Sequence, residues 1–316
     1  MTTTTTNLNA NEIFFGVEIE TIAPTALTRQ GLIVGGYHRP VQVPFLPEGW
    51  KASYDCSIHT TRGYMACEIV SPKLRGANGL KQIADVCEIL TAKGFKVNSS
   101  TGVHVSVDFT GASNDEKQRL IQTVAFCEKG IYATTGTHRR ERGIYCQSVH
   151  NYGTRQDAAA RIDSSYHGDR YHILNLTNLY NGQNRVEFRA FSGSLNAKKI
   201  SGWVMMCVGL VQRARGNKRM PKWTGSSDPA WVAKRLGTNG NGQREFIRIQ
   251  QFLNWQPALR AKKTAYGMMD SEFGFDAIQA ELKRLAKKYA TNSPRQPSAN
   301  HAPGTAPGGA VLTSSR

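Results

Sequence analysis

Four segments of the chain alternate apolar and polar residues with a period of two, which predicts β-strands. They are residues 13–20, 67–70, 103–109 and 186–191. Three other segments repeat apolar residues at helical spacing, which predicts helices. They are residues 78–93, 114–131 and 196–213. Because strands and helices interleave without regular β–α–β steps, we expect an α+β fold, with helices on one side of a largely antiparallel sheet.

Composition divides the chain of 316 residues into four predicted regions. Residues 12–225 hold the strand pattern and form the predicted main domain, and residues 226–290 form a predicted basic helical extension. Residues 1–11 are rich in Thr and Asn, and residues 291–316 are rich in Pro, Gly, Ser and Ala. Neither end can build an apolar core, so both are predicted to be disordered tails.

The polar faces of the predicted strands carry an unusual set of side chains. On these faces lie Glu18, Glu20, Glu68, His104, Glu187 and Arg189. One interpretation is a face that simply meets water, since alternate polar residues are typical of such sheets. The other is a cleft, because a solvated face usually mixes Thr, Lys, Ser and Gln. Carboxylates with an imidazole suit Mg²⁺ or Mn²⁺, and an Arg two residues after a Glu suits a phosphate oxygen.

A cleft of this kind predicts metal-assisted phosphoryl chemistry. The sequence has neither a GxxxxGK[ST] phosphate loop nor a GxGxxG motif after a strand, so metals and arginines would have to hold a nucleotide. Arg139 and Arg140, in the run HRRERG, are candidate contacts to a nucleotide or to an acidic substrate. A solvated charged loop is the more common explanation of such a run.

The net charge of +17 lies mostly outside the strand motifs. Residues 212–263 hold 12 basic and two acidic residues, interleaved with aromatic side chains. Aromatic residues among basic ones are typical of single-strand nucleic-acid binding, which is one alternative function. The other interpretations are a basic helical appendage whose aromatics form a core, a polyanion contact, or a segment that holds an acidic substrate beside the cleft.

The sequence predicts a cytoplasmic protein without membrane contact. It has no run of 18 apolar residues, and its first residues lack the basic and apolar regions of a secretory signal. The six cysteines are scattered and form no C-x-x-C pair, which is typical of a reducing compartment and argues against a zinc ribbon.

Five motifs in order give the chain a family resemblance. They are FFGVEIE, WKASYDCSI, CEIVSPKLRG, TGVHVSVDF and NRVEFRAFSGSLNAKKISGW. Over residues 13–213 the chain resembles the amidoligases, carboxylate–amine ligases of the glutamine synthetase superfamily. The resemblance implies a curved antiparallel sheet whose concave face holds ATP and Mg²⁺ or Mn²⁺. It also implies an ATP-dependent reaction that forms an amide or isopeptide bond through an acyl phosphate.

The resemblance also implies roles for individual residues. The implied metal ligands are Glu18, Glu20, Glu68 and Glu187. His104 and Arg189 match catalytic positions that face the nucleotide phosphates, while Asp55 and Ser57 match a motif at the substrate end. Asn196 lies at the family's usual distance from the E-F-R strand, and a plain helix N-cap explains it at least as well. The implied substrates are a carboxylate and an amine, such as an amino acid, a peptide or a cell-wall fragment.

Three positions depart from the family pattern. Cys56 replaces a Gly, Thr101 stands where a Cys is common, and Ser106 replaces the second His of its strand. Since Ser106 is a poor metal ligand, a catalytically inactive member that acts in binding or assembly is an alternative. A phosphotransferase acting on a guanidino group is a further alternative within the superfamily, although the order of motifs favours the ligase.

Overall fold

The computed structural model describes residues 10, 12–149, 170–216 and 275–291. Most of the two predicted tails lies outside the described residues, as does the predicted boundary between residues 225 and 226. The same holds for the aromatic residues of the basic segment, all of which come after residue 216. Among the described residues, no helix combines the length and the apolar character needed to cross a membrane.

An open antiparallel sheet forms the centre of the molecule, in the order β2-β3-β4-β1-β6-β8-β7, with β5 beside β1. The four predicted strands form its middle, and their bounds are β1 Phe14–Pro24, β4 Tyr64–Val70, β6 Gly102–Asp108 and β8 Arg185–Ser192. Shorter strands flank them, namely β2 Val41–Gln42, β3 Lys51–Ser53, β5 Leu74–Arg75 and β7 Leu174–Asn175. The predicted α+β class is confirmed.

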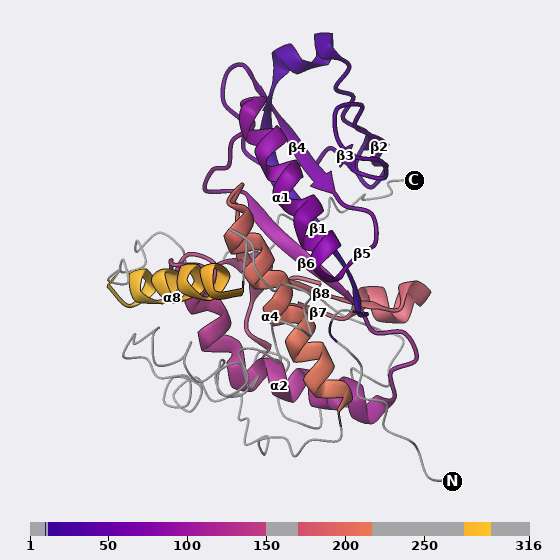
Figure 1. Cartoon of the computed structure of the whole chain (residues 1–316), viewed down its shortest axis with the longest axis vertical. Helices are drawn as coiled ribbons and strands as arrows, with labels where there is room; N and C mark the ends of the chain where they lie inside the picture. The colour runs from indigo at the N-terminus through magenta and orange to yellow at the C-terminus, as the bar shows by residue number, and fades with distance from the viewer. Residues whose placement is uncertain (1–9, 11, 150–169, 217–274, 292–316) are drawn as a thin grey trace, which may run out of the picture.

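The helices cover one face of this sheet (Figure 1). The long ones are α1 Gly76–Ala92, α2 Asn114–Ala133, α4 Ala197–Arg215 and α8 Phe275–Thr291. Short turns are η1 Thr25–Gln30, η2 Ile144–Cys146 and η4 Leu179–Gln183. Asn196 caps α4 by accepting a hydrogen bond from the Lys199 amide, and Ser113 caps α2 with a capping box. The N-cap interpretation of Asn196 is therefore confirmed.

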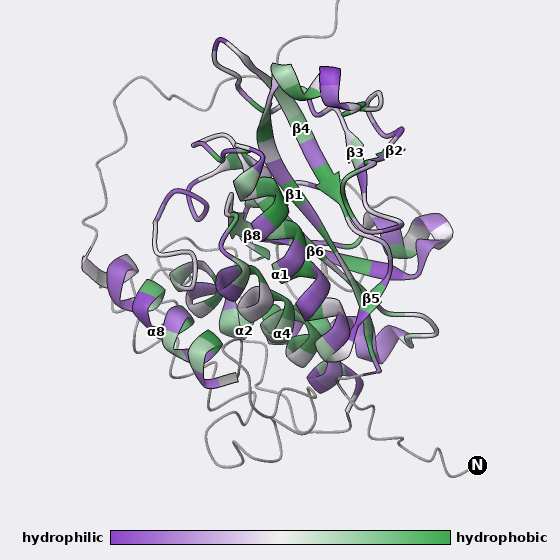
Figure 2. Ribbon diagram, turned by 45° about the horizontal axis from the view of Figure 1, so that its top comes forward, coloured by the Kyte–Doolittle hydropathy of each residue, from purple (hydrophilic) through white to green (hydrophobic). Residues whose placement is uncertain are grey.

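Period-two alternation separates the two faces of the sheet, as expected. Val17, Ile19, Val105 and Phe188 are buried among the helices, and Figure 2 shows β1 and β4 alternating between apolar and polar residues along their length. The other face carries the acidic residues. All six cysteines are free, and five of them are buried.

Helix α4 lies at the centre of the helical layer and contacts α1, α2, α8 and β6. Trp203 of α4 stacks on Phe191 of β8 with ring centroids 4.9 Å apart, and its Nε1 donates a 3.1 Å hydrogen bond to the Thr134 carbonyl at the end of α2. Helix α8 packs on α4 at Gly202, where a Cβ would lie 2.9 Å from Leu282. The absent side chain lets the two helices approach closely.

We predict that Leu282→Ala lowers the free energy of unfolding by about 2–5 kcal/mol, because this buried side chain fills the contact between α8 and α4. The measurement is chemical denaturation of the full chain. Lys283→Ala, at the exposed neighbouring position, should change it by less than about 0.5 kcal/mol. Equal effects of the two substitutions would contradict the docking of α8.

Candidate functional site

The register of the sheet brings the predicted acidic residues into adjacent rows. Glu18 on β1 pairs with His104 on β6, and Glu20 on β1 pairs with Glu68 on β4. Residues directly opposite on neighbouring antiparallel strands project their side chains to the same face, where they interact. The sheet pairing alone therefore gathers side chains from three strands on its polar face.

His104 lies at the centre of this face and is only 3% exposed. Its Nδ1 is 3.4 Å from a carboxylate oxygen of Glu18 and 3.4 Å from one of Glu187, and its Nε2 is 3.4 Å from one of Glu20. Burial and then the positive charge of Arg189 lower the pKa of His104 to about 4, although two of the carboxylates act in the opposite direction. The ring is thus neutral near pH 7, and its single N–H cannot satisfy three carboxylates.

Glu68 faces the same cluster from β4. Burial, followed by the negative charges of Glu18 and Glu20, raises its pKa to about 8. The Ser53 hydroxyl on β3 donates a 3.0 Å hydrogen bond to Glu68, and the Gly102 amide on β6 donates one of 2.5 Å to Glu20. Sequence reasoning missed both donors, because a single Ser on a three-residue strand and a backbone amide carry no motif.

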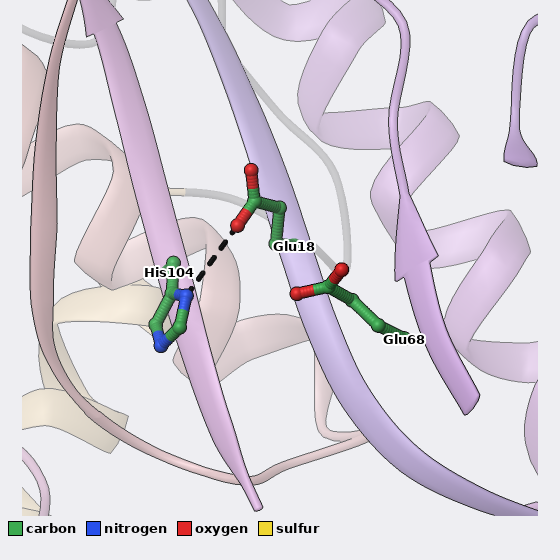
Figure 3. Close-up of side chains that lie close together, drawn as sticks. All are labelled: Glu18, Glu68 and His104. Atoms are coloured by element: carbon green, nitrogen blue, oxygen red, sulfur yellow. Dashed lines mark hydrogen bonds and ion pairs between the residues drawn. The ribbon is translucent and has the colours of Figure 1, made fainter. Parts of the chain in front are cut away.

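The carboxylates and the imidazole form two groups in which one ligand atom from each residue lies within 4.8 Å of the others. The groups are Glu18, Glu68 and His104, and Glu20, Asp55 and Glu68. Figure 3 shows the side chains of the first group: the carboxylate of Glu18 on β1 is turned toward His104 on β6, and the carboxylate of Glu68 on β4 is turned toward Glu18. Carboxylate oxygens suit Mg²⁺ or Mn²⁺, and in the first group a neutral imidazole adds a nitrogen donor, so the donor set of either group fits a divalent cation.

Glu187 and Arg189 of β8 flank the cluster. Arg189 Nη1 donates a 2.5 Å hydrogen bond to Glu187 Oε1, while the side-chain amides of Asn175 and Asn178 lie 2.8 Å and 3.4 Å from Glu187 Oε2. Both oxygens of Glu187 therefore already have protein partners, and Glu187 belongs to neither of the two groups above. Its predicted role as a metal ligand stays a prediction, and its observed contacts are with Arg189, His104 and the two asparagines.

A β-bulge shapes the backbone beside His104. Val103 pairs with Phe191 and Val105 with Phe188, so that Arg189 and Ala190 both stand opposite the single residue His104. Bulges bend a strand and change the direction of a side chain, and they are frequent next to active sites. No residue pattern in β8 predicts this irregularity.

The loop that carries the HRRERG run reaches the site through its backbone and through Arg140. Arg140 Nη2 donates a 2.7 Å hydrogen bond to the Arg189 carbonyl, and Arg189 Nε lies 3.4 Å from the Tyr145 carbonyl. Arg139 is exposed. The structure thus brings Arg140 to the cluster as a support of β8, whereas contact of either arginine with a nucleotide stays a prediction.

A polar network fastens this loop to helices α2 and α8. Glu141 accepts hydrogen bonds from Lys129 of α2 and from the Tyr289 hydroxyl of α8. The two ring nitrogens of His138 lie 3.2 Å from Glu141 and 3.0 Å from the Tyr289 carbonyl. Through this network the packing of α8 is connected to the position of Arg140.

The remaining predicted residues lie at the edges of the cluster. Asp55, predicted as a substrate contact, joins Glu20 and Glu68 in the second group, and its Oδ1 accepts a 2.7 Å hydrogen bond from the Ser57 amide. Ser57 is half-buried and Cys56 between them is exposed. A contact of Asp55 or Ser57 with substrate is untested, but the position of Asp55 also suits a cation.

A known protein family matches the chain, and solved structures are similar to it. Residues 11–211 match the model of a family described as "Putative amidoligase enzyme". Among solved structures, the chain is similar to a bifunctional glutathione synthetase from Pasteurella multocida, with a TM-score of 0.46 and 10% identity over 90% of this chain and 49% of that one. It is also similar to a novel glutamine synthase homolog, with a TM-score of 0.36 and 12% identity over 88% of this chain and 71% of that one. The chain thus spans about half the length of the glutathione synthetase, and no curated protein matches it.

The electrostatics of the cluster predict how His104 titrates. In Arg189→Met the pKa of His104 should rise above its value of about 4, by roughly 1 pH unit, because a repelling cation is lost while Glu20 and Glu187 remain. The measurement is an NMR titration of the imidazole. Arg75→Met, at an exposed position on β5, is the control and should leave this pKa unchanged. An unchanged pKa in Arg189→Met would contradict the described arrangement.

Proposed function

Because the chain belongs to the amidoligase family, we propose that it is an ATP-dependent ligase that joins a carboxylate to an amine on the polar face of its sheet. The observation that carries this proposal is the pair of ligand groups that share Glu68. Two cation sites with a common carboxylate are a recurrent arrangement in phosphoryl chemistry. Arg189, a permanently charged side chain, lies beside them.

The proposed reaction has two steps. A carboxylate oxygen of the acid substrate attacks the γ-phosphorus of ATP, and the bond to the β-phosphate oxygen breaks, giving an acyl phosphate and ADP. The amine nitrogen then attacks the acyl carbon, the C–O bond to phosphate breaks, and the nitrogen loses a proton. The products are an amide, inorganic phosphate and ADP.

The chain's own residues have distinct parts in this proposal. Mg²⁺ or Mn²⁺, when bound, would neutralise the charge that develops on the transferred phosphoryl group. Glu18, Glu20 and Glu68 would hold the cations, and His104 would be available as a neutral ligand. Arg189 would bind a phosphoryl oxygen through the N–H groups that Glu187 does not occupy. These assignments rest on the proximity of the donors and on their charges.

Cation binding should depend on pH through Glu68. Its folded-state pKa is raised to about 8, so below that pH a cation must displace a proton from this carboxyl group. The affinity for Mn²⁺ is expected to rise with pH from about 6 to 8, by up to tenfold per pH unit, and to level off above this range.

The measurement is calorimetric titration of the full chain with Mn²⁺. Glu68→Gln should bind Mn²⁺ more weakly and lose most of the pH dependence, since the titrating group is gone. Glu88→Gln, at an exposed position on α1, is the matched control and should behave as the wild type. Mn²⁺ affinity that is equal in Glu68→Gln and wild type would remove Glu68 from the site.

Ligase activity should require both the carboxylate of Glu18 and the guanidinium of Arg189. With Mg²⁺, ATP and a mixture of candidate carboxylates and amines, we expect ADP formation together with a product whose mass is the sum of two partners minus one water. Glu18→Ala and Arg189→Ala should each lower the rate by at least about 100-fold, because each removes a charge that faces the transferred group.

The control for activity is Glu88→Gln, which should retain the wild-type rate. Equal traces of ADP in wild type, Glu18→Ala and Arg189→Ala would instead favour the inactive binding or assembly protein. A product that retains the phosphoryl group on nitrogen would favour the guanidino phosphotransferase.

A further inference from the structure

A strongly positive surface lies on the helical side of the molecule, away from the acidic cluster. It consists of the exposed face of α8 and the first turn of α4, two helices that pack on each other beside α2. Figure 1 shows α8 at the margin of the helical layer. We call it the α8 surface, and its six basic residues are Lys198, Lys199, Lys283, Arg284, Lys287 and Lys288. With Glu281 beside them, six positive charges and one negative charge give a net charge of +5.

Helical spacing separates the positive face of α8 from its apolar face. Ile278, Leu282 and Leu285 are buried, and the first two lie against Gly202 of α4. The basic residues at positions 283, 284, 287 and 288 are all exposed, and Figure 2 shows polar residues of α8 interrupted by apolar ones. Residues four apart along a helix are separated by about 6 Å. The exposed face therefore carries two short rows of evenly spaced cations.

Most of these positive charges have no counter-charge in the protein. Arg284 pairs with Glu281 through hydrogen bonds of 2.7 Å and 2.8 Å. Within residues 12–149, 170–216 and 275–291, none of the five lysines of the α8 surface forms an ion pair. A lysine that is held in an ion pair has to break it before it can bind a ligand, and these lysines do not.

The two lysines of α4 stand where positive charge is unfavourable. Lys198 and Lys199 lie in the first turn of the helix, whose N-terminal end carries a partial positive charge. Burial lowers the pKa of Lys199, and although Glu281 acts in the opposite direction, the positive charges of Arg284 and Lys288 lower it further. An anion on the α8 surface would relieve both kinds of repulsion, so the charge arrangement favours an anionic partner.

We propose that the α8 surface binds the phosphate backbone of a nucleic-acid strand. A nucleic acid presents negative charges at regular intervals along a line, which suits the evenly spaced cations of α8. Lysine binds phosphates as a point charge and needs no fixed orientation. The whole chain carries a net charge of +17, which would attract a polyanion from a distance. An acidic polypeptide is the rival partner, but its carboxylates are not evenly spaced.

This property goes beyond the proposed ligase function and does not depend on it. The α8 surface belongs to the helical layer, whereas the acidic cluster lies on the opposite face of the sheet. It also lies outside the basic segment 212–263, to which the sequence alone assigned a possible nucleic-acid contact. A strand bound here would touch the backs of α4 and α8 and leave the cluster free.

Binding is measured by fluorescence anisotropy of the full chain with a labelled oligothymidylate of about 20 nucleotides, without ATP. The salt concentration is varied from about 50 to 200 mM, because each phosphate contact to a single strand contributes about 0.7 to the slope of log affinity against log salt. Unlabelled RNA, duplex DNA and polyglutamate of equal total charge serve as competitors. We expect the nucleic acids to compete and polyglutamate to compete at least about tenfold more weakly.

A triple substitution tests the surface itself. Lys283→Gln, Lys287→Gln and Lys288→Gln together remove three charges from exposed positions and retain good helix formers. The triple variant should bind at least about tenfold more weakly, with a salt slope smaller by about 2. The same three positions changed to Arg should bind as the wild type does. An unchanged melting temperature shows that both variants fold.

A matched control separates this surface from the net charge of the chain. Arg29→Gln, Arg62→Gln and Lys96→Gln together remove the same charge at exposed positions outside α4 and α8. This control should bind the oligonucleotide almost as the wild type does. The double variant Lys198→Gln, Lys199→Gln should bind more weakly, because the surface spans both helices.

The proposal is overturned if the oligonucleotide does not bind, if the α8 triple variant binds as the wild type does, or if the control triple variant loses as much affinity. Polyglutamate that competes as well as nucleic acid would instead assign the surface to an acidic protein. The ligase is judged separately, since Glu18→Ala should bind the oligonucleotide normally and the α8 triple variant should keep the wild-type rate of ADP formation.

Discussion

Repulsion among carboxylates is the constraint on which the polar face of this sheet depends. The pairing of β1 with β4 and β6 holds Glu18, Glu20 and Glu68 close together, and like charges on neighbouring strands destabilise a sheet. The repulsion is reduced because the pKa of Glu68 is raised to about 8 and because Arg189 lies alongside, whereas His104, which burial and Arg189 keep neutral, adds no positive charge. A bound cation would offset the repulsion that remains among the carboxylates. The same arrangement of carboxylates therefore lowers the stability of the protein and favours cation binding.

The backbone of β8 beside the cluster is held in place by a loop that is bonded to helices α2 and α8. The bulge in β8 sets Arg189 beside His104, and Arg140 braces that bulge through the Arg189 carbonyl. Glu141, one residue further, is fastened to α2 and to α8. Helix α8 therefore supports the site, because it packs on α4 and its Tyr289 contacts Glu141, next to Arg140 in the chain.

The polar face has two chemically different halves. One half is acidic and contains the three carboxylates that surround His104. The other half contains a cavity of about 300 Å³, which is lined in part by Gly16, Ser106, Asp108 and Arg185. Ser106 departs from the family pattern, and its small side chain lines the cavity opposite Gly16.

Strand alternation in the sequence was enough to assign faces. It predicted the four central strands and the polar set that the structure brings together, because side-chain direction in a strand follows from local backbone geometry. Helical spacing of apolar residues predicted α1, α2 and α4 behind them. Asn196 as a cap is equally local. By contrast, Ser53 and Asn175 lie on strands of two or three residues, which are too short to show a period.

Tertiary structure decided everything that depends on register. Which carboxylate faces which, the bulge opposite His104, and the position of Asp55 beside Glu20 and Glu68 all arise from contacts between segments far apart in the chain. The pKa shifts follow from those contacts and from burial. The sequence by itself determined which residue types share a face, and the pairing of strands determined what that face can bind.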